Sequence, residues 1–208
     1  MSPSLRLFLV ITLVLLWATN ACAAIVVAAA DSLPEEKARA DVVCDGTDDQ
    51  LELAKSLARG RRGKTKVDVD PKTQQTVDCI LNHAVEWLPG NYYLSDTLEV
   101  PSAANCVIRA EGTTFHYLKD EGNCVVIRGM NRCRYNFGTI ESSSSGAALC
   151  IRPDAKMPAL MSFVNFTGLI GQNQRGTGLL LDPTHENICV NRFEGTDVLG
   201  FERGVYVG

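Results

Sequence analysis

A short pattern repeats through residues 121–208 and constrains the fold more than any other feature of the sequence. Each copy is a brief run of apolar, often β-branched residues bounded by glycine or proline, which is typical of a β-strand. The last apolar residues of four copies lie 24, 30 and 26 residues apart, at Ile127, Ile151, Leu181 and Val207. A recurring internal period of this length predicts an architecture in which copies of one unit stack on one another.

A second phrase, with asparagine followed closely by phenylalanine, alternates with the first. We interpret its asparagines as amides that hydrogen-bond from one unit to the next, and its rings as core residues, rather than as binding residues. The asparagines are Asn136, Asn165 and Asn191, and the phenylalanines are Phe137, Phe166 and Phe193.

One such unit cannot bury its apolar face alone, but parallel stacking places equivalent residues about 4.8 Å apart and buries it. The leucine-rich-repeat frame is missing, and the unit is shorter than a propeller blade. A β-sandwich remains open, because short, regularly spaced strands suit it too, but the recurring phrases favour an all-β solenoid. Residues 85–208 then form about four or five coils. They end inside a strand phrase, so we expect further coils downstream or self-association through the open C-terminal coil.

The first 24 residues are typical of a secretory signal peptide. Arg6 supplies the positive charge, the apolar run Leu7–Trp17 is too short to span a membrane, and small residues follow around Cys22. We therefore expect a secreted, periplasmic or cell-surface protein, with a linker at 25–40. Without Arg6 the formal net charge of −4 becomes −5, and this acidity disfavours nucleic acid as a partner.

A capping region is expected at 41–84. Thr47 to Gln50 matches a capping box and predicts an amphipathic helix over 47–58, with an apolar stripe of Leu51, Ala54, Leu57 and Ala58. Such a helix would cover the first coil of a solenoid.

Residues 59–76 are polar and are expected to form a solvated loop, and 76–84 suit either a helix or a strand. The basic run within 59–64 could contact a polyanion, although a solvated loop is the simpler interpretation. Asp68 and Asp70 are the one calcium candidate, but no further carboxylate follows at EF-hand spacing, so no cofactor is predicted.

Over residues 41–208 the chain resembles a known protein family. The run Asp45-Gly-Thr-Asp-Asp49 before an amphipathic helix, and then Leu88-Pro-Gly-Asn-Tyr-Tyr-Leu94, are similar to the opening of pectin-lyase-like proteins. The resemblance implies a right-handed parallel β-helix with a short N-terminal capping α-helix. It also implies work on polysaccharides, since the family includes lyases, hydrolases, epimerases and phage tailspikes. Fold alone does not choose among these activities.

The sequence departs from the active-site patterns of that family. Polygalacturonase-like hydrolases carry paired aspartates and a His-Gly on the coils, whereas His83, His116 and His185 are followed here by Ala, Tyr and Glu. The arginine-rich signature of calcium pectate lyases is also missing. Two classes therefore stay open: an enzyme acting on an acidic polysaccharide, and a non-catalytic glycan-binding or structural solenoid.

Stacking of the repeats predicts one outward column of charged residues. Arg128, Arg152 and Asp182 each follow the last apolar residue of a repeat, and Tyr206 lies close to the same column. Guanidinium groups beside an aromatic ring suit an acidic sugar, because arginine binds carboxylates in bidentate fashion. The alternative is a surface ladder in which Arg152 pairs with Asp182.

The densest cluster of titratable residues follows the third repeat. The candidate catalytic residues are Asp182, His185, Glu186 and Asp197, and the cluster also contains Glu194. A glycosidase needs two nearby carboxyl groups, and a lyase or epimerase needs a base beside a neutralised carboxylate. Exposed turns also collect such residues without any catalytic role.

Seven cysteines follow the signal peptide. Disulfides are one interpretation, and the odd number leaves a thiol unpaired. For those inside strand phrases, burial as small apolar residues is the alternative, and the lack of a C-x-x-C pattern disfavours zinc. The strand-phrase cysteines are Cys124, Cys150 and Cys189, and the others are Cys44, Cys79, Cys106 and Cys133.

Overall fold

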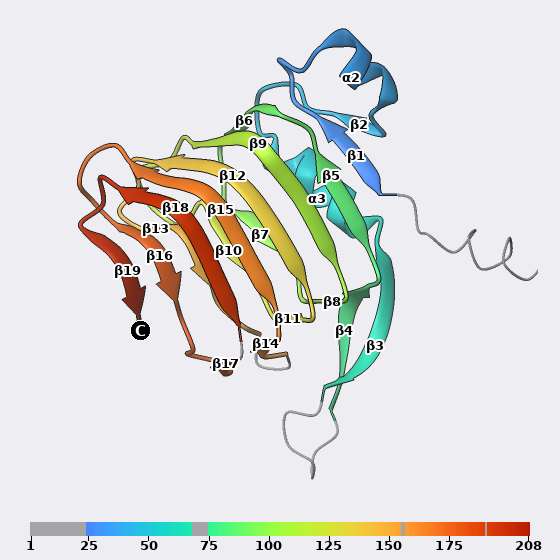
Figure 1. Ribbon diagram of the computed structural model, residues 1–208, viewed down its shortest axis with the longest axis vertical. Helices are drawn as coiled ribbons and strands as arrows, with labels where there is room; N and C mark the ends of the chain where they lie inside the picture. Colours follow the sequence, from blue (N-terminus) through green and yellow to red (C-terminus); the bar gives the residue numbers. More distant parts are fainter. Residues whose placement is uncertain (1–23, 68–74, 155–156, 190) are drawn as a thin grey trace, which may run out of the picture.

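The computed structural model describes residues 24–67, 75–154, 157–189 and 191–208, and it forms a parallel β-solenoid of about five turns (Figure 1). The fold class predicted from the repeat is confirmed. The predicted signal peptide and the calcium candidates Asp68 and Asp70 lie outside the described residues.

Three sheets run along the solenoid, and successive coils add strands to each of them. Sheet 1 contains, in order, β18 (Arg192–Leu199), β15 (Phe163–Gly171), β12 (Arg134–Ser142), β9 (Val107–Tyr117), β5 (Ala84–Trp87), β1 (Ile25–Ala28) and β2 (Val42–Val43), and β6 (Gly90–Leu94) also pairs with β9. Sheet 2 contains β19 (Arg203–Val207), β16 (Thr177–Leu181), β13 (Ala147–Ile151), β10 (Val125–Ile127) and β7 (Leu98–Val100). Sheet 3 contains β17 (Ile188–Cys189), β14 (Ala159–Leu160), β11 (Met130–Asn131), β8 (Ala103–Ala104), β4 (Gln75–Leu81) and β3 (Arg61–Val67).

The register of sheet 2 matches the sequence repeat. Ile127 pairs with Ile151, Ile151 with Leu181, and Leu181 with Val207, all in parallel. The same register extends one coil further back, where Val100 pairs with Ile127. The first phrase of the sequence is therefore the sheet 2 strand of each coil.

Aromatic rings fill the first coils of the solenoid. Trp87 meets Phe115 edge-on at a centroid distance of 5.8 Å, and Tyr92 stacks on Phe115 at 5.5 Å. Phe137 and Phe166 are in register on neighbouring coils and are buried, as predicted. Such rings bury large apolar areas and gain from edge-to-face contacts, so they contribute strongly to the core of these coils.

The predicted stacking of asparagines is found on two coils and is wrong for the third. The Asn136 amide donates to Glu111 Oε1 at 2.7 Å rather than to the next asparagine. Asn136 pairs in register with Asn165, but Asn165 pairs with Glu194. Asn191 lies instead in the turn before β18, where its Oδ1 accepts the Ser162 N–H at 2.9 Å. The third phrase has an extra residue between asparagine and phenylalanine, and the register follows the buried strand positions rather than the asparagine.

Helix α3 (Gln50–Ala58) covers the first coil, but its start and its buried face differ from the prediction. Asp49, rather than Thr47, is the N-cap residue, and its carboxylate accepts the backbone N–H groups of Gly46 (2.9 Å) and Tyr93 (2.8 Å). Leu53 is fully buried, whereas Leu51 is 54% exposed. Of the predicted stripe, Leu57 is buried as expected, whereas Leu51, Ala54 and Ala58 are exposed, because the coil packs against the Leu53 and Leu57 side of the helix.

The segment 25–40, predicted to be a linker, contains β1 and the short helix α2 (Pro34–Arg39). Strand β1 joins sheet 1 between β5 and β2, and its Val27 and Ala28 are fully buried. Part of the predicted loop 59–76 is also regular, since β3 pairs with β4 as an antiparallel hairpin. These segments extend the cap on the N-terminal coil (Figure 1).

The turn from sheet 3 to sheet 1 uses one left-handed residue in each of four successive coils. Asn82, Asn105, Arg132 and Met161 follow strand residues that are in register, and their φ angles are between 45° and 54°. Asparagine tolerates this conformation, whereas arginine and methionine adopt it at a cost. The chain thus turns sharply at the same point in successive coils.

Candidate functional site

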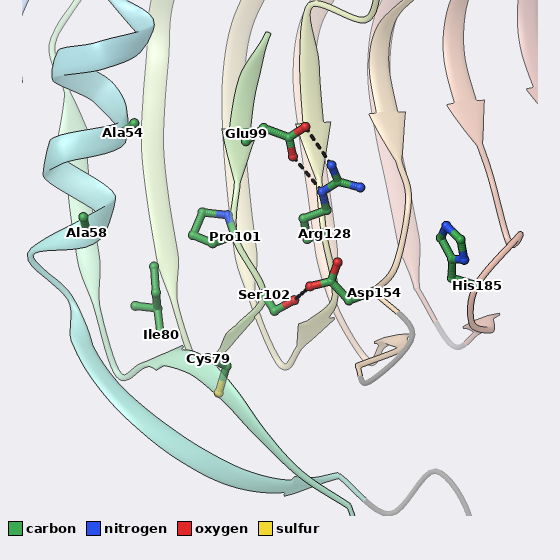
Figure 2. Close-up of a pocket in the computed structure, with 10 residues that line it drawn as sticks. All are labelled: Ala54, Ala58, Cys79, Ile80, Glu99, Pro101, Ser102, Arg128, Asp154 and His185. Atoms are coloured by element: carbon green, nitrogen blue, oxygen red, sulfur yellow. Dashed lines mark hydrogen bonds and ion pairs between the residues drawn. The ribbon is translucent and has the colours of Figure 1, made fainter.

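A groove of about 880 Å³ runs along the outside of the solenoid where sheet 2 turns into sheet 3 (Figure 2). One wall carries Ala54 and Ala58 of α3, with Cys79 and Ile80 of β4. The other wall is mostly polar and is made by the sheet 2 to sheet 3 turns of successive coils. That wall contains Glu99, Pro101, Ser102, Arg128, Asp154 and His185.

The polar wall is shaped by a change in turn length. The turns 101–102 and 128–129 are short, whereas the turns 152–158 and 182–187 are longer. The longer turns bring residues of later coils toward earlier ones. Asp154 thus accepts a hydrogen bond from Ser102, which lies two coils earlier (Figure 2).

Arg128 forms a bidentate ion pair across one coil. Its Nε and Nη2 donate to the two carboxylate oxygens of Glu99 at 2.6 and 2.8 Å. A planar guanidinium in this geometry is held firmly, and the pair cancels its own charge. Arg128 lines the groove, as expected for a binding residue, but one side of its fork is already occupied.

Arg152 pairs with Asp182 on the next coil, which was the alternative interpretation of this column. The Arg152 Nε donates to Asp182 Oδ2 at 2.7 Å, and Thr184 donates to Oδ1. Partial burial raises the pKa of Asp182, but the hydrogen bonds from Thr184 and Arg152 outweigh it, so the net pKa is lowered. Asp182 is therefore held in the ionised form.

The predicted catalytic cluster is divided between two parts of the solenoid. Asp182, His185 and Glu186 all lie on the turn 182–187, and His185 lines the groove. Asp197 lies on β18 in sheet 1, paired in register with Gly168, and Glu194 of the same strand is bonded to Arg192. Asp197 and Glu194 therefore lie on sheet 1 rather than on the turn that carries Asp182.

Tyr206 lies at the C-terminal end of the sheet 2 column. It is in register with Leu180, which places it on the coil after Asp182, and the Arg203 guanidinium lies 4.8 Å from its ring centroid. Two further coils separate it from Arg128. Tyr206 is not among the residues that line the groove, so its predicted binding role beside both arginines stays a prediction.

Sequence reasoning missed Glu99, Ser102 and Asp154. Glu99 was detectable, because moving the repeat back by one coil aligns Val100 with Ile127 and so places Glu99 beside Arg128. Ser102 and Asp154 meet only because the turn 152–158 folds back over two coils, and no local pattern signals this contact. The cysteine prediction was also wrong in one case, since Cys189 is exposed whereas Cys124 and Cys150 are buried.

Comparisons of the chain with models of protein families, with curated proteins and with solved structures found no match. Within the described residues, no group of three or more histidine, cysteine or acidic side chains is arranged to hold a metal ion. Across the same part of the chain, no helix has the length and apolar character needed to cross a membrane.

Proposed function

We propose that this protein is a β-helix of the pectin-lyase-like type and that it binds a polysaccharide chain in the groove. The observation that carries the proposal is the contrast between the two walls. Ala54, Ala58 and Ile80 offer an apolar surface, and the opposite wall offers carboxylates, a guanidinium and an imidazole. A sugar ring has apolar faces and hydroxyl-bearing edges, so a groove of this kind suits both parts of it.

The charges of the groove favour a chain rich in hydroxyl groups over a strongly acidic one. Glu99 cancels the charge of Arg128, and Asp154 adds a further carboxylate to the same wall. An acidic sugar is the second candidate, because Glu99 uses two of the five N–H donors of Arg128 and leaves three for a ligand.

Binding is better supported than catalysis. A general acid in a glycosidase requires a carboxyl group whose pKa is raised. The pKa of Asp182 is lowered instead, and the groove carboxylates Glu99 and Asp154 are each engaged by a hydrogen-bond donor. We further propose that the protein is exported and meets its glycan outside the cytoplasm, as the sequence of residues 1–24 predicts.

The test is calorimetric titration of the chain with neutral glycans, polygalacturonate and alginate. Ala58→Trp fills the groove, and we expect it to weaken binding by about tenfold or more, a change of about 1.4 kcal/mol. Ala38→Trp is the matched control, because Ala38 is exposed on α2 outside the groove. Ultraviolet absorbance of unsaturated products and new reducing ends are monitored in parallel. Failure to bind any of these glycans, or equal binding by both variants, would refute the proposal.

A further inference from the structure

Two buried cysteines occupy equivalent positions on neighbouring coils, away from the groove. Ala104 is in register with Asn131, and Val107 with Arg134, so Cys106 and Cys133 stack in the same turn. Each follows a left-handed residue with φ of 54°, so the two turns have the same local conformation. Stacked residues of parallel strands are about 4.8 Å apart, which lies within the Cα separation of disulfides, about 4.4–6.8 Å.

The two thiols also have equivalent surroundings. The Cys106 Sγ lies 3.4 Å from the Ala104 carbonyl of its own coil and 3.5 Å from the Ile80 carbonyl of the coil before. The Cys133 Sγ likewise lies 3.5 Å from the carbonyl two residues earlier and 3.3 Å from that of Ala103 on the preceding coil. Cys133 therefore leans toward the coil that carries Cys106.

The two thiols differ in the direction of their pKa shifts. A hydrogen bond between them raises the pKa of Cys106 and lowers the pKa of Cys133, which the Tyr135 hydroxyl also hydrogen-bonds. The thiolate is the attacking species in thiol–disulfide exchange. Either thiol of the pair, once ionised, can therefore attack a disulfide, and its neighbour can resolve the mixed disulfide that forms.

We propose that Cys106 and Cys133 are a disulfide-forming site that joins two successive coils, with a low-molecular-weight disulfide as the oxidant. The thiolate of one cysteine attacks one sulfur of the oxidant, forms a mixed disulfide and releases the first thiolate, which takes up the proton. The other cysteine then loses its proton, attacks the cysteine sulfur of the mixed disulfide and releases the second thiol. The two cysteines lose two electrons and two protons in total, and the oxidant becomes two thiols.

Because both thiols are at most 5% exposed, exchange takes place before the coils close or during local opening. The bond closes a loop of one coil and restricts the unfolded chain. For a chain of this length, we expect the oxidised protein to melt about 10 °C above the reduced protein.

The test is refolding of the full chain in oxidised glutathione, followed by alkylation in denaturant and tandem mass spectrometry of the peptides. We expect a Cys106–Cys133 crosslink and the corresponding rise in melting temperature. Cys133→Ser should abolish both. Cys79→Ala and Cys189→Ser are the matched controls and should retain them, since Cys79 is another buried thiol of sheet 3 and Cys189 is exposed.

The refolded parent must give a β-rich circular dichroism spectrum, so that alkylation reports on the folded chain. Recovery of both cysteines as alkylated thiols from that folded sample would overturn the proposal. A crosslink from Cys133 to Cys79, in place of Cys106, would also overturn it. The outcome is independent of glycan binding, because neither Cys106 nor Cys133 lines the groove.

Discussion

Replacing Leu53 by alanine tests how helix α3 covers the first coil. Leu53 is fully buried and belongs to the main core cluster, whereas Leu51, two residues earlier on the same helix, is 54% exposed. Truncation of a buried leucine costs the transfer free energy of the lost atoms plus a cavity term, about 3–5 kcal/mol in total. The same change at an exposed helical site stays within about 0.5 kcal/mol, because alanine is at least as good a helix former.

Thermal and urea unfolding, followed by circular dichroism, measure the two variants side by side. For a chain of about 200 residues, each kcal/mol lowers the melting temperature by about 2–4 °C. Leu53→Ala should therefore melt about 6–20 °C below the parent, and Leu51→Ala within about 2 °C of it. Equal melting temperatures for the two variants would refute the assignment of the buried face and the capping role of the helix.

Two further changes test the turns and the charged column. Met161→Asn should raise the melting temperature by about 1–4 °C, because Met161 is exposed at φ 45° and asparagine tolerates that conformation. The reverse change at the equivalent turn, Asn105→Met, should lower the melting temperature. A lower melting temperature for Met161→Asn would contradict this explanation. The pKa of Asp182 is lower in the folded than in the unfolded protein, so Asp182 stabilises the fold above the unfolded pKa of about 3.9. That stabilisation is lost as the pH falls through the folded pKa. In urea unfolding at pH 7, the free energy of unfolding of the parent should exceed that of Asp182→Asn by less than about 1 kcal/mol, and near pH 2 the two should be equal. A stability difference that grows in acid would contradict the ion pair with Arg152.

The sequence predicted the coil register closely, because the register depends on buried apolar positions. Ile127, Ile151, Leu181 and Val207 recur at one place in the coil, and a slip of one residue would turn a whole strand inside out. Asn191 was misplaced because an asparagine outside the buried positions does not determine the register.

The cap was predicted only in outline. The sequence indicates an amphipathic helix, but Leu51 and Leu53 are both leucines, and their spacing alone does not say which one faces the coil. The capping box predicted from Thr47 is replaced by an N-cap at Asp49, whose carboxylate also accepts the N–H of Tyr93, 44 residues away. Contacts between distant segments, rather than local propensity, determine both features.

The groove follows from departures from the repeat rather than from the repeat itself. A regular solenoid with short turns presents a smooth column of side chains at each corner, as the turns 101–102 and 128–129 do. The longer turn 152–158 brings Asp154 back to Ser102, and the turn 182–187 places His185 on the same wall. Since these turns carry no apolar period, sequence periodicity predicts the scaffold but not the wall. Shortening 182–187 to two residues should therefore remove His185 from the groove while the strand register Ile151 to Leu181 persists.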